Sequence, residues 1–206
     1  MDRLPVVQPA SGDGLIPLPF DDVGDLDGLT ESGVVVVVPE AEPVVGPHRL
    51  RLDPAASWGV PAHVTVLYPF VSPPDLRTAD LNRLGEAVAQ VAAFDAELPS
   101  VDWFGETVVW LAPEPASQFR RLISVVGAAF PDLLPYGGGF DDVVPHLTIG
   151  GPSRGTLDEL RRAADAVAPQ LPVRTRVGEV AVMAGCREAG SWRTVAHLPL
   201  ASAPDR

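Results

Sequence analysis

The chain has 206 residues, 46% of them hydrophobic and 20% charged, so it is expected to fold as one domain or two tightly packed lobes. Its 15 basic residues oppose 27 acidic ones, and the net charge of −12 argues against a protein that coats long nucleic acids. All 15 basic residues are arginine, which excludes Schiff-base lysines, lysine adenylation and a P-loop lysine.

The cellular setting is indicated by what the sequence lacks. A single cysteine, Cys186, allows no internal disulfide and fits a reducing compartment. No apolar run reaches the roughly 20 residues that a membrane span needs, and the first residues do not resemble a signal peptide. We therefore expect a cytoplasmic monomer with no membrane partner.

The first half of the chain alternates between strand and helix patterns. Residues 1–31 are rich in Pro, Gly and Asp and are expected to be flexible, leaving residues 32–206 as the folded domain. A β-branched run over 33–39 predicts a strand buried on both faces. The expected elements that follow are a helix over 43–52, a strand over 61–69, a helix over 78–93 and strands over 95–104 and 107–112.

The second half continues the mixture. Apolar residues predict a helix over 119–130, and a glycine run over 137–139, expected to be a flexible approach, precedes a strand over 144–150. Thr156 and Glu159 form a capping box that opens another helix, and strands are expected over 173–183 and 191–198. Interleaved helices and hairpin-like strand pairs favour an α+β fold with largely antiparallel sheets.

One short pattern occurs twice, as His63-Val64-Thr65-Val66 and as His146-Leu147-Thr148-Ile149, each closely preceded by proline and inside an expected strand. Four histidines and eight threonines in 206 residues would give only about 0.16 such triplets by chance. In a strand, alternate side chains share a face, so each histidine projects beside its threonine. The repeat therefore predicts two matched groups of functional residues.

These residue types suit chemistry at phosphorus. Histidine exchanges a proton near neutral pH, and threonine donates a hydrogen bond to an oxyanion without carrying charge. Two copies facing one cleft supply a base, an acid and two hydroxyl donors, with no metal or cofactor required. No H-x-H, H-x-x-x-H or H-E-x-x-H spacing is present, so we expect no metal site.

On these two motifs the chain resembles the 2H phosphoesterase superfamily, which contains bacterial 2′-5′ RNA ligases and 2′,3′-cyclic phosphodiesterases. The resemblance follows the element order over about residues 33–199. It implies a bilobal fold of two pseudo-symmetric sheets with flanking helices and a central cleft. It also implies hydrolysis, or reversible ligation, of 2′,3′-cyclic phosphodiesters of small nucleotides or RNA ends.

By the same resemblance, His63 and His146 are the acid and base, in an order that the sequence leaves open, and Thr65 and Thr148 hold the nonbridging phosphate oxygens. The acidic balance favours a small nucleotide or a short RNA end over long RNA. We expect kcat/KM to form a bell between roughly pH 5 and 8.

Other residues have competing interpretations. Tyr68 and Trp192 are candidate substrate-binding residues that stack a base, with core packing as the alternative. His48 is expected to be an exposed helix residue and His197 a strand residue near the surface. Candidate phosphate partners, which the sequence does not rank, are Arg49, Arg51, Arg174, Arg176 and Arg193.

Two further functions remain open at this level. The cleft could bind a nucleotide or RNA end without turning it over, or the proline-rich N-terminal segment could recruit a partner. The natural substrate, the direction of the reaction and the position of the phosphate in the product are not given by the sequence.

Overall fold

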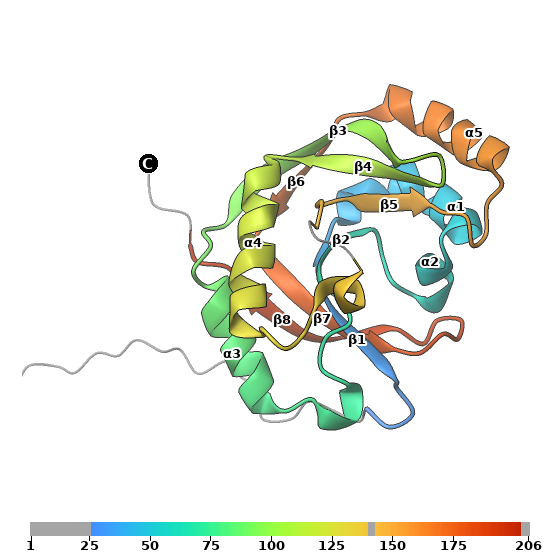
Figure 1. Ribbon diagram of the computed structural model, residues 1–206. Coiled ribbons are helices and arrows are strands. Elements are labelled where there is room, and N and C mark those ends of the chain that lie inside the picture. The colour runs from blue at the N-terminus through green and yellow to red at the C-terminus, as the bar shows by residue number, and fades with distance from the viewer. Residues whose placement is uncertain (1–25, 140–142, 203–206) are drawn as a thin grey trace, which may run out of the picture.

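Two four-stranded antiparallel sheets are built by residues 26–139 and 143–202, which the computed structural model describes (Figure 1). The strands are β1 (Glu31–Val37), β2 (His63–Leu67), β3 (Phe94–Phe104), β4 (Val108–Glu114), β5 (Leu147–Gly150), β6 (Val173–Val177), β7 (Glu179–Gly185) and β8 (Arg193–Pro199). The α-helices are α1 (Glu42–Leu52), α2 (Pro54–Trp58), α3 (Thr78–Val88), α4 (Ala116–Ala129) and α5 (Leu157–Val167). The predicted α+β class with antiparallel sheets is confirmed.

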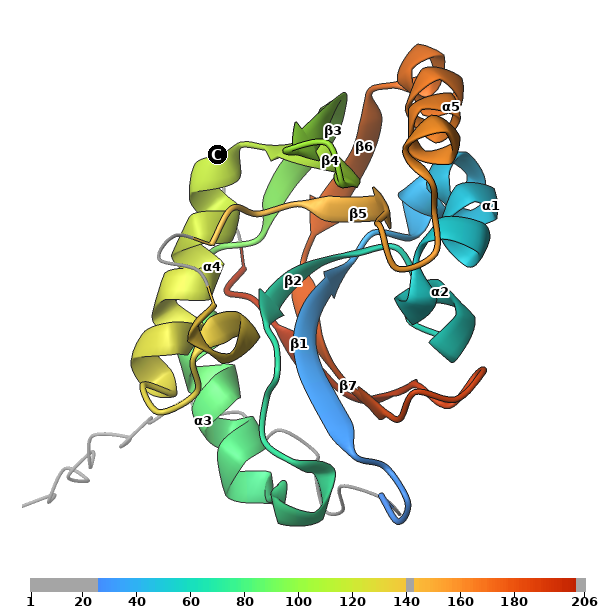
Figure 2. The same cartoon turned by 45° about the vertical axis from the view of Figure 1, so that its right-hand side comes forward.

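The two sheets have matching layouts. The first sheet has the order β2-β1-β7-β8, and the second has the order β5-β4-β3-β6. The strands that carry the two H-x-T motifs, β2 and β5, are therefore the edge strands of their sheets, and they are in contact with each other near the centre of the molecule (Figure 2). This arrangement brings together motifs that are about 80 residues apart in the sequence.

The strand β1 lies inside the first sheet, as its composition predicts. Val34, Val35 and Val36 are at most 5% exposed, and β1 pairs with β2 on one side and with β7 on the other. A run of β-branched residues fits a strand that is covered on both faces. On an open sheet edge these valines would promote pairing with another chain and aggregation, but in this fold both edges of β1 are paired.

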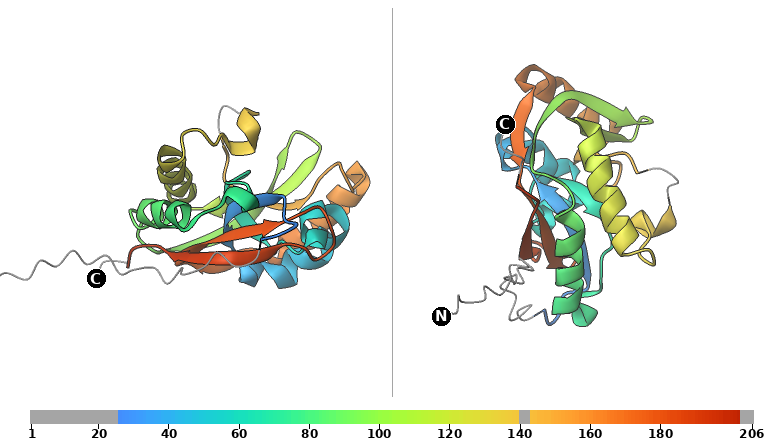
Figure 3. Two further views of the ribbon diagram at one scale, coloured as in Figure 1. Left: turned by 90° about the horizontal axis from the view of Figure 1, so that it is seen from below. Right: turned by 90° about the vertical axis from the view of Figure 1, so that its left-hand side faces the viewer.

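The helices gather in two groups on either side of the motif strands (Figures 1 and 3). The apolar faces of α3 and α4, including Leu84 and Phe119, are buried in the main core, and the two helices contact each other. On the other side α1 contacts α5, which begins at the predicted capping box of Thr156 and Glu159. No described helix is long and apolar enough to cross a membrane.

The prediction of one strand over residues 173–183 was wrong. The chain breaks at Gly178, so that β6 belongs to the second sheet and β7 to the first. The exposure pattern reflects this change, because β6 alternates between buried and exposed residues while all of β7 after Glu179 is buried. A continuous β-rich sequence gives no local signal that its two halves join different sheets.

The flexible segment predicted over residues 1–31 lies mostly outside the described residues, which begin at Leu26. Leu26 packs against the main core, and Thr30 N donates a hydrogen bond to Gly185 O at 3.0 Å. The strand β1 then begins at Glu31, two residues before the expected start.

Candidate active site

The motif residues of β2 lie on the face of the first sheet that is turned away from the main core. Val64 and Val66 enter that core, whereas His63 and Thr65 project from the opposite face and are partly exposed. We call this side of the sheet the motif face. The same alternation in and before β5 buries Leu147 and Ile149 and leaves His146 and Thr148 partly exposed.

Both histidines are anchored by the same hydrogen bond. His63 Nδ1 lies 2.7 Å from the carbonyl oxygen of Pro61, and His146 Nδ1 lies 2.7 Å from that of Val144. A carbonyl oxygen only accepts, so each Nδ1 carries the proton and donates it. In the neutral ring, Nε2 then remains as the basic nitrogen that can exchange a proton.

The two imidazoles have depressed pKa values. Burial lowers the pKa of His63 to about 4, assisted by the positive charge of Arg49 and by His146, and opposed by the Pro61 carbonyl and Asp53. Burial also lowers the pKa of His146, opposed by its hydrogen bond to the Val144 carbonyl. The strands β2 and β5 contact each other, and His146, directly before β5, is among the charges that lower the pKa of His63.

A buried ion-pair network supports the first motif. Arg49 is 1% exposed, and its Nε and Nη2 atoms lie 3.2 and 2.9 Å from Asp53 Oδ2. Its Nη1 is 3.8 Å from Glu42 Oε1, and that carboxylate accepts a hydrogen bond from Ala62 N, directly before His63. The sequence made Arg49 a candidate phosphate partner, but in the structure its guanidinium contacts the carboxylates of Asp53 and Glu42.

The helix α1 joins the two motif strands. Glu42, at its start, binds Ala62 N beside the first motif, and the carbonyl oxygen of Leu52, at its end, accepts a 3.0 Å hydrogen bond from Gly151 N just after β5. The side chain of Leu52 also packs directly over Gly150. One helix therefore sets the positions of both histidine-bearing segments.

Gly150→Ala is expected to destabilise the protein by about 1–3 kcal/mol, because overpacking a tight core contact forces its neighbours to shift. A Cβ at this position would lie 2.5 Å from Leu52 Cβ and 2.9 Å from Leu160 Cδ2. Gly127→Ala in α4 is the matched control, since its Cβ would meet nothing within 4 Å. Urea denaturation would contradict this account if the two variants lost equal stability.

Aromatic rings surround His146. The ring of Phe104 lies edge-on at 5.0 Å between centroids, and that of Trp110 lies at 5.9 Å. These two rings also stack on each other at 4.7 Å. The sequence analysis missed both residues. Trp110 lies on β4, which pairs directly with β5, and Phe104 lies on β3, the next strand of the sheet. This placement was the signal that could have identified them.

Tyr68 and Trp192, the predicted substrate-binding residues, lie together beside the first motif. Their ring centroids are 6.4 Å apart, and both belong to or pack against a small apolar cluster that includes Val35 and Met183 on the motif face. Trp192 is 9% exposed and donates its indole N–H to Cys186 O. Tyr68 is the more accessible ring of the two.

A polar corner borders this aromatic cluster. The Tyr68 hydroxyl donates a 2.6 Å hydrogen bond to Glu31 Oε2, and Arg187 Nε donates a 2.8 Å hydrogen bond to Glu31 Oε1. The guanidinium of Arg187 also lies 5.9 Å from the centroid of Trp58. The motif face of the first sheet thus combines the side chains of one H-x-T motif, an aromatic surface and a charged rim.

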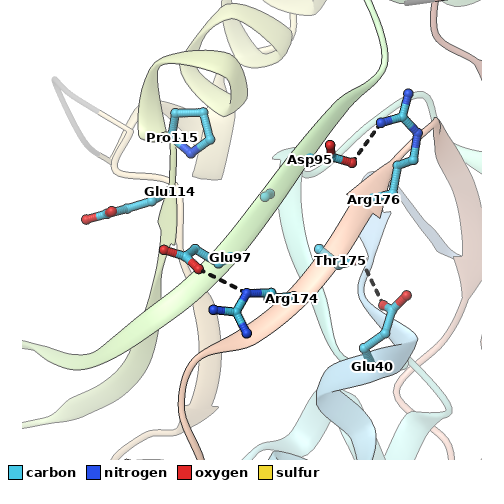
Figure 4. A pocket seen from close by; sticks show the side chains of 9 residues that line it. Glu40, Asp95, Glu97, Glu114, Pro115, Arg174, Thr175 and Arg176 are labelled. Carbon is cyan, nitrogen blue, oxygen red and sulfur yellow. Dashed lines mark hydrogen bonds and ion pairs between the residues drawn. The ribbon is translucent and has the colours of Figure 1, made fainter.

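A groove of about 790 Å³ lies elsewhere on the molecule, over β3 and β6 (Figure 4). Its two arginines pair with carboxylates, Arg176 Nη1 with Asp95 Oδ1 at 2.7 Å and Arg174 Nε with Glu97 Oε2 at 3.6 Å. None of the motif residues lines it. The groove is therefore distinct from the candidate active site, and its arginines are engaged by carboxylates.

The remaining histidines stand apart from the motifs. His197 is exposed as predicted, and its Nδ1 lies 2.7 Å from Glu179 Oε1. His48 was predicted to be exposed but is only partly exposed, and its Nδ1 is buried without a hydrogen-bond partner. Within residues 26–139 and 143–202, no three His, Cys, Asp or Glu side chains are grouped so as to hold a metal ion.

Comparisons with known proteins find similarity in sequence family and in fold. A family model described as the 2′-5′ RNA ligase superfamily matches residues 37–187. The protein TT0787 of Thermus thermophilus is similar in structure, with a TM-score of 0.55 and 20% identity over 84% of this chain and 98% of that one. E. coli LigT complexed with NADP+ has a TM-score of 0.52 and 15% identity over 84% and 99% of the chains. No curated protein sequence matches this chain.

Proposed function

Because the chain belongs to the 2′-5′ RNA ligase superfamily, we propose that it is a metal-independent phosphoesterase that opens 2′,3′-cyclic phosphates of small nucleotides or RNA ends. The observation that carries this proposal is that the two H-x-T motifs lie side by side, on edge strands of the two sheets that contact each other. Each motif histidine has the same Nδ1 anchor and thus the same basic nitrogen. Such a pair supplies the base and the acid that phosphoryl chemistry requires.

In the proposed hydrolysis, one histidine accepts a proton from water at Nε2 while the water oxygen forms a bond to phosphorus. The other histidine donates its Nε2 proton to the ribose oxygen whose bond to phosphorus breaks. The product is a phosphomonoester with a free neighbouring hydroxyl. If a hydroxyl of a second RNA takes the place of water, the same groups in the same roles would join that hydroxyl to the phosphate; by microscopic reversibility, the groups in exchanged roles would break the new bond and re-form the cyclic phosphate.

His63 is the better candidate for the base and His146 for the acid. With a pKa of about 4, roughly one His63 in a thousand would carry a proton at pH 7, which leaves its Nε2 free to accept one. The buried guanidinium of Arg49 further disfavours a charged His63 ring. Thr65 and Thr148 then donate hydrogen bonds to the nonbridging oxygens, on which negative charge accumulates.

A small nucleotide fits the surroundings of this pair. The accessible ring of Tyr68, backed by Trp192, offers a base-stacking surface on the same sheet face as His63. The net charge of −12 opposes an extended polyanion. The similar E. coli LigT structure holds NADP+, a compound of nucleotide size, which supports this proposal.

The direct test is incubation of the purified protein with each 2′,3′-cyclic mononucleotide in the presence of EDTA. Phosphomonoester formation, followed by ³¹P NMR, is the expected result. An RNA with a 2′,3′-cyclic phosphate, offered with a second RNA bearing a 5′-hydroxyl, would reveal joining. Nucleotide binding without turnover of any of these substrates would instead identify a binding module, and a rate that EDTA abolishes would contradict the metal-independent mechanism.

The pH dependence follows from the two histidine environments. Activity requires a neutral His63, so kcat/KM should fall as pH drops through about 4. It also requires a protonated His146, whose pKa lies below its ordinary value of 6.5, so kcat/KM should fall again as pH rises through that lower value. The bell is thus expected to be more acidic than the sequence predicts. A plateau that extends to pH 8 would contradict the assignment.

A further inference from the structure

A single hydrogen bond leaves the ring of His146 partly free to turn. His146 Nδ1 donates to the carbonyl oxygen of Val144 at 2.7 Å, which fixes one atom of the imidazole. The torsion about the Cβ–Cγ bond of histidine is broad, because this bond joins a tetrahedral carbon to a planar ring. The direction of His146 Nε2, the atom that would protonate the leaving oxygen, therefore depends on what else touches the ring.

Two aromatic rings stand across the plane of this imidazole. The ring of Phe104 lies at 90° to it with 5.0 Å between centroids, and the ring of Trp110 lies at 67° with 5.9 Å. Phe104 and Trp110 themselves stack at 4.7 Å, with only 24° between their planes. Rings at these separations pack against each other, so turning the imidazole about its Cβ–Cγ bond would strain or break these contacts.

The sheet register places both rings beside the second motif. Trp110 of β4 pairs with Thr148 of β5 on one side and with Asp102 of β3 on the other. Directly paired residues share a face of a sheet, and Phe104 follows Asp102 by two residues, so its side chain lies on the same face. The aromatic pair therefore comes from strands outside the motif, but it lies on the face of the second sheet that carries Thr148.

The indole of Trp110 fills this space at a cost. Trp110 is 5% exposed, and its Nε1 is buried without a hydrogen-bond partner among the described residues. A buried N–H without a partner destabilises the folded state, and a phenylalanine would fill much of the same volume without such a group. Packing stability alone therefore does not account for an indole at this place, whereas a need for a broad, rigid ring beside His146 does.

We propose that Phe104, stacked on Trp110, is a positioning residue that fixes the ring plane of His146 and thereby directs its Nε2 toward the leaving oxygen. This inference rests on the proposed function. It gives the two histidines supports of different kinds, because the segment of His63 is held by the carboxylate of Glu42 and the ring of His146 by aromatic contacts. An aromatic support carries no positive charge, so it holds a ring that must be protonated without repelling its charge.

The first test compares Phe104→Leu with Trp103→Leu in the hydrolysis of a 2′,3′-cyclic nucleotide. Leucine at position 104 keeps an apolar side chain but removes the flat ring, so kcat should fall about tenfold while KM changes less than twofold. Trp103 is the matched control, because it is the preceding residue of β3, is also partly exposed and packs against the main core instead. Trp103→Leu should keep the wild-type kcat at temperatures well below its thermal midpoint.

A double-mutant cycle on kcat/KM shows whether Phe104 acts through His146. In the His146→Ala background, Phe104→Leu should lower kcat/KM no further, because the ring that it positions is already gone. Combined with Thr65→Val on the other sheet, the Phe104→Leu loss should multiply. A loss that multiplies with His146→Ala would show that Phe104 supports the site in general, and would overturn the proposed role.

An NMR titration of the His146 ring tests the contact without turnover. Phe104→Ala admits water to the imidazole, so the pKa of His146, which burial holds below its ordinary value, should rise toward 6.5. Protonation alone would then favour activity at pH 7, so a fall in kcat of the same variant reports a misplaced ring. His63 is the titratable group that faces His146 from β2, and the titration is therefore repeated in His63→Asn. Trp103→Ala should leave the pKa of His146 unchanged.

The outcomes distinguish the two proposals. A Phe104→Leu variant with wild-type kcat, or a His146 titration that Phe104→Ala leaves unchanged, would overturn the role of Phe104 and leave the phosphoesterase proposal intact. A wild-type protein that neither turns over a cyclic nucleotide nor binds the product nucleotide in calorimetry would overturn both.

Discussion

Replacing either His63 or His146 by alanine is expected to lower kcat for 2′,3′-cyclic nucleotide hydrolysis by about 10³-fold or more. Each variant loses one of the two proton-transfer groups, and water in a partly buried site replaces it poorly. The two losses should not multiply in the double variant, because the base and the acid act in the same transition state. Initial rates with saturating substrate and EDTA would measure the effect.

Two controls make the histidine result specific. His197→Ala removes an exposed imidazole that pairs with Glu179, and it should leave kcat unchanged. His63→Asn keeps a side-chain N–H that can donate to the Pro61 carbonyl, so it preserves the anchor of the motif while removing the basic nitrogen. It should be as inactive as His63→Ala and as stable as the wild type. An active His63→Asn or His146→Ala variant would exclude the paired mechanism.

The second large effect concerns stability. Arg49→Met is expected to reduce the free energy of unfolding by about 3–5 kcal/mol, because it leaves the buried Asp53 carboxylate without its counter-charge. Arg176→Met is the matched control, since Arg176 forms an ion pair of 2.7 Å with Asp95 on the surface. Its loss should cost about 0–1 kcal/mol. Urea denaturation at pH 7 compares the two.

The same Arg49 variant carries a functional signature. Removing the guanidinium should raise the pKa of His63, so the acid limb of kcat/KM should move to higher pH. Arg49→Met combined with Asp53→Asn should recover part of the lost stability, because the orphaned charge is gone and the side-chain oxygen still caps α2 at Ala55 N. Equal destabilisation by Arg49→Met and Arg176→Met would contradict the role of the buried pair.

The sequence predicted the parts of this site that depend on local pattern. The two H-x-T triplets, their strand context and the alternation that separates His63 from Val64 all follow from period-two geometry. The fold class followed from the mixture of helix and strand patterns. These predictions succeed because strand alternation is a property of a few neighbouring residues.

The residues that the sequence did not assign depend on contacts between distant segments. Arg49 was one arginine among several, and only the packing of α1 under the first motif distinguishes it. The break at Gly178 depends on which sheet each half of the segment joins. Tyr136 adjoins a glycine run that indicated flexibility, whereas in the structure its backbone N–H donates a hydrogen bond to the carbonyl oxygen of Tyr68.

The double attachment of α1 has a consequence for how the molecule opens. Through Glu42 and Leu52 the helix holds the backbone on both histidine-bearing segments, so any fluctuation that releases α1 disturbs both at once. Amide hydrogen exchange should therefore show β2, α1 and β5 losing protection as one cooperative unit. We therefore expect that heating disrupts the two histidine-bearing segments together, in a single event.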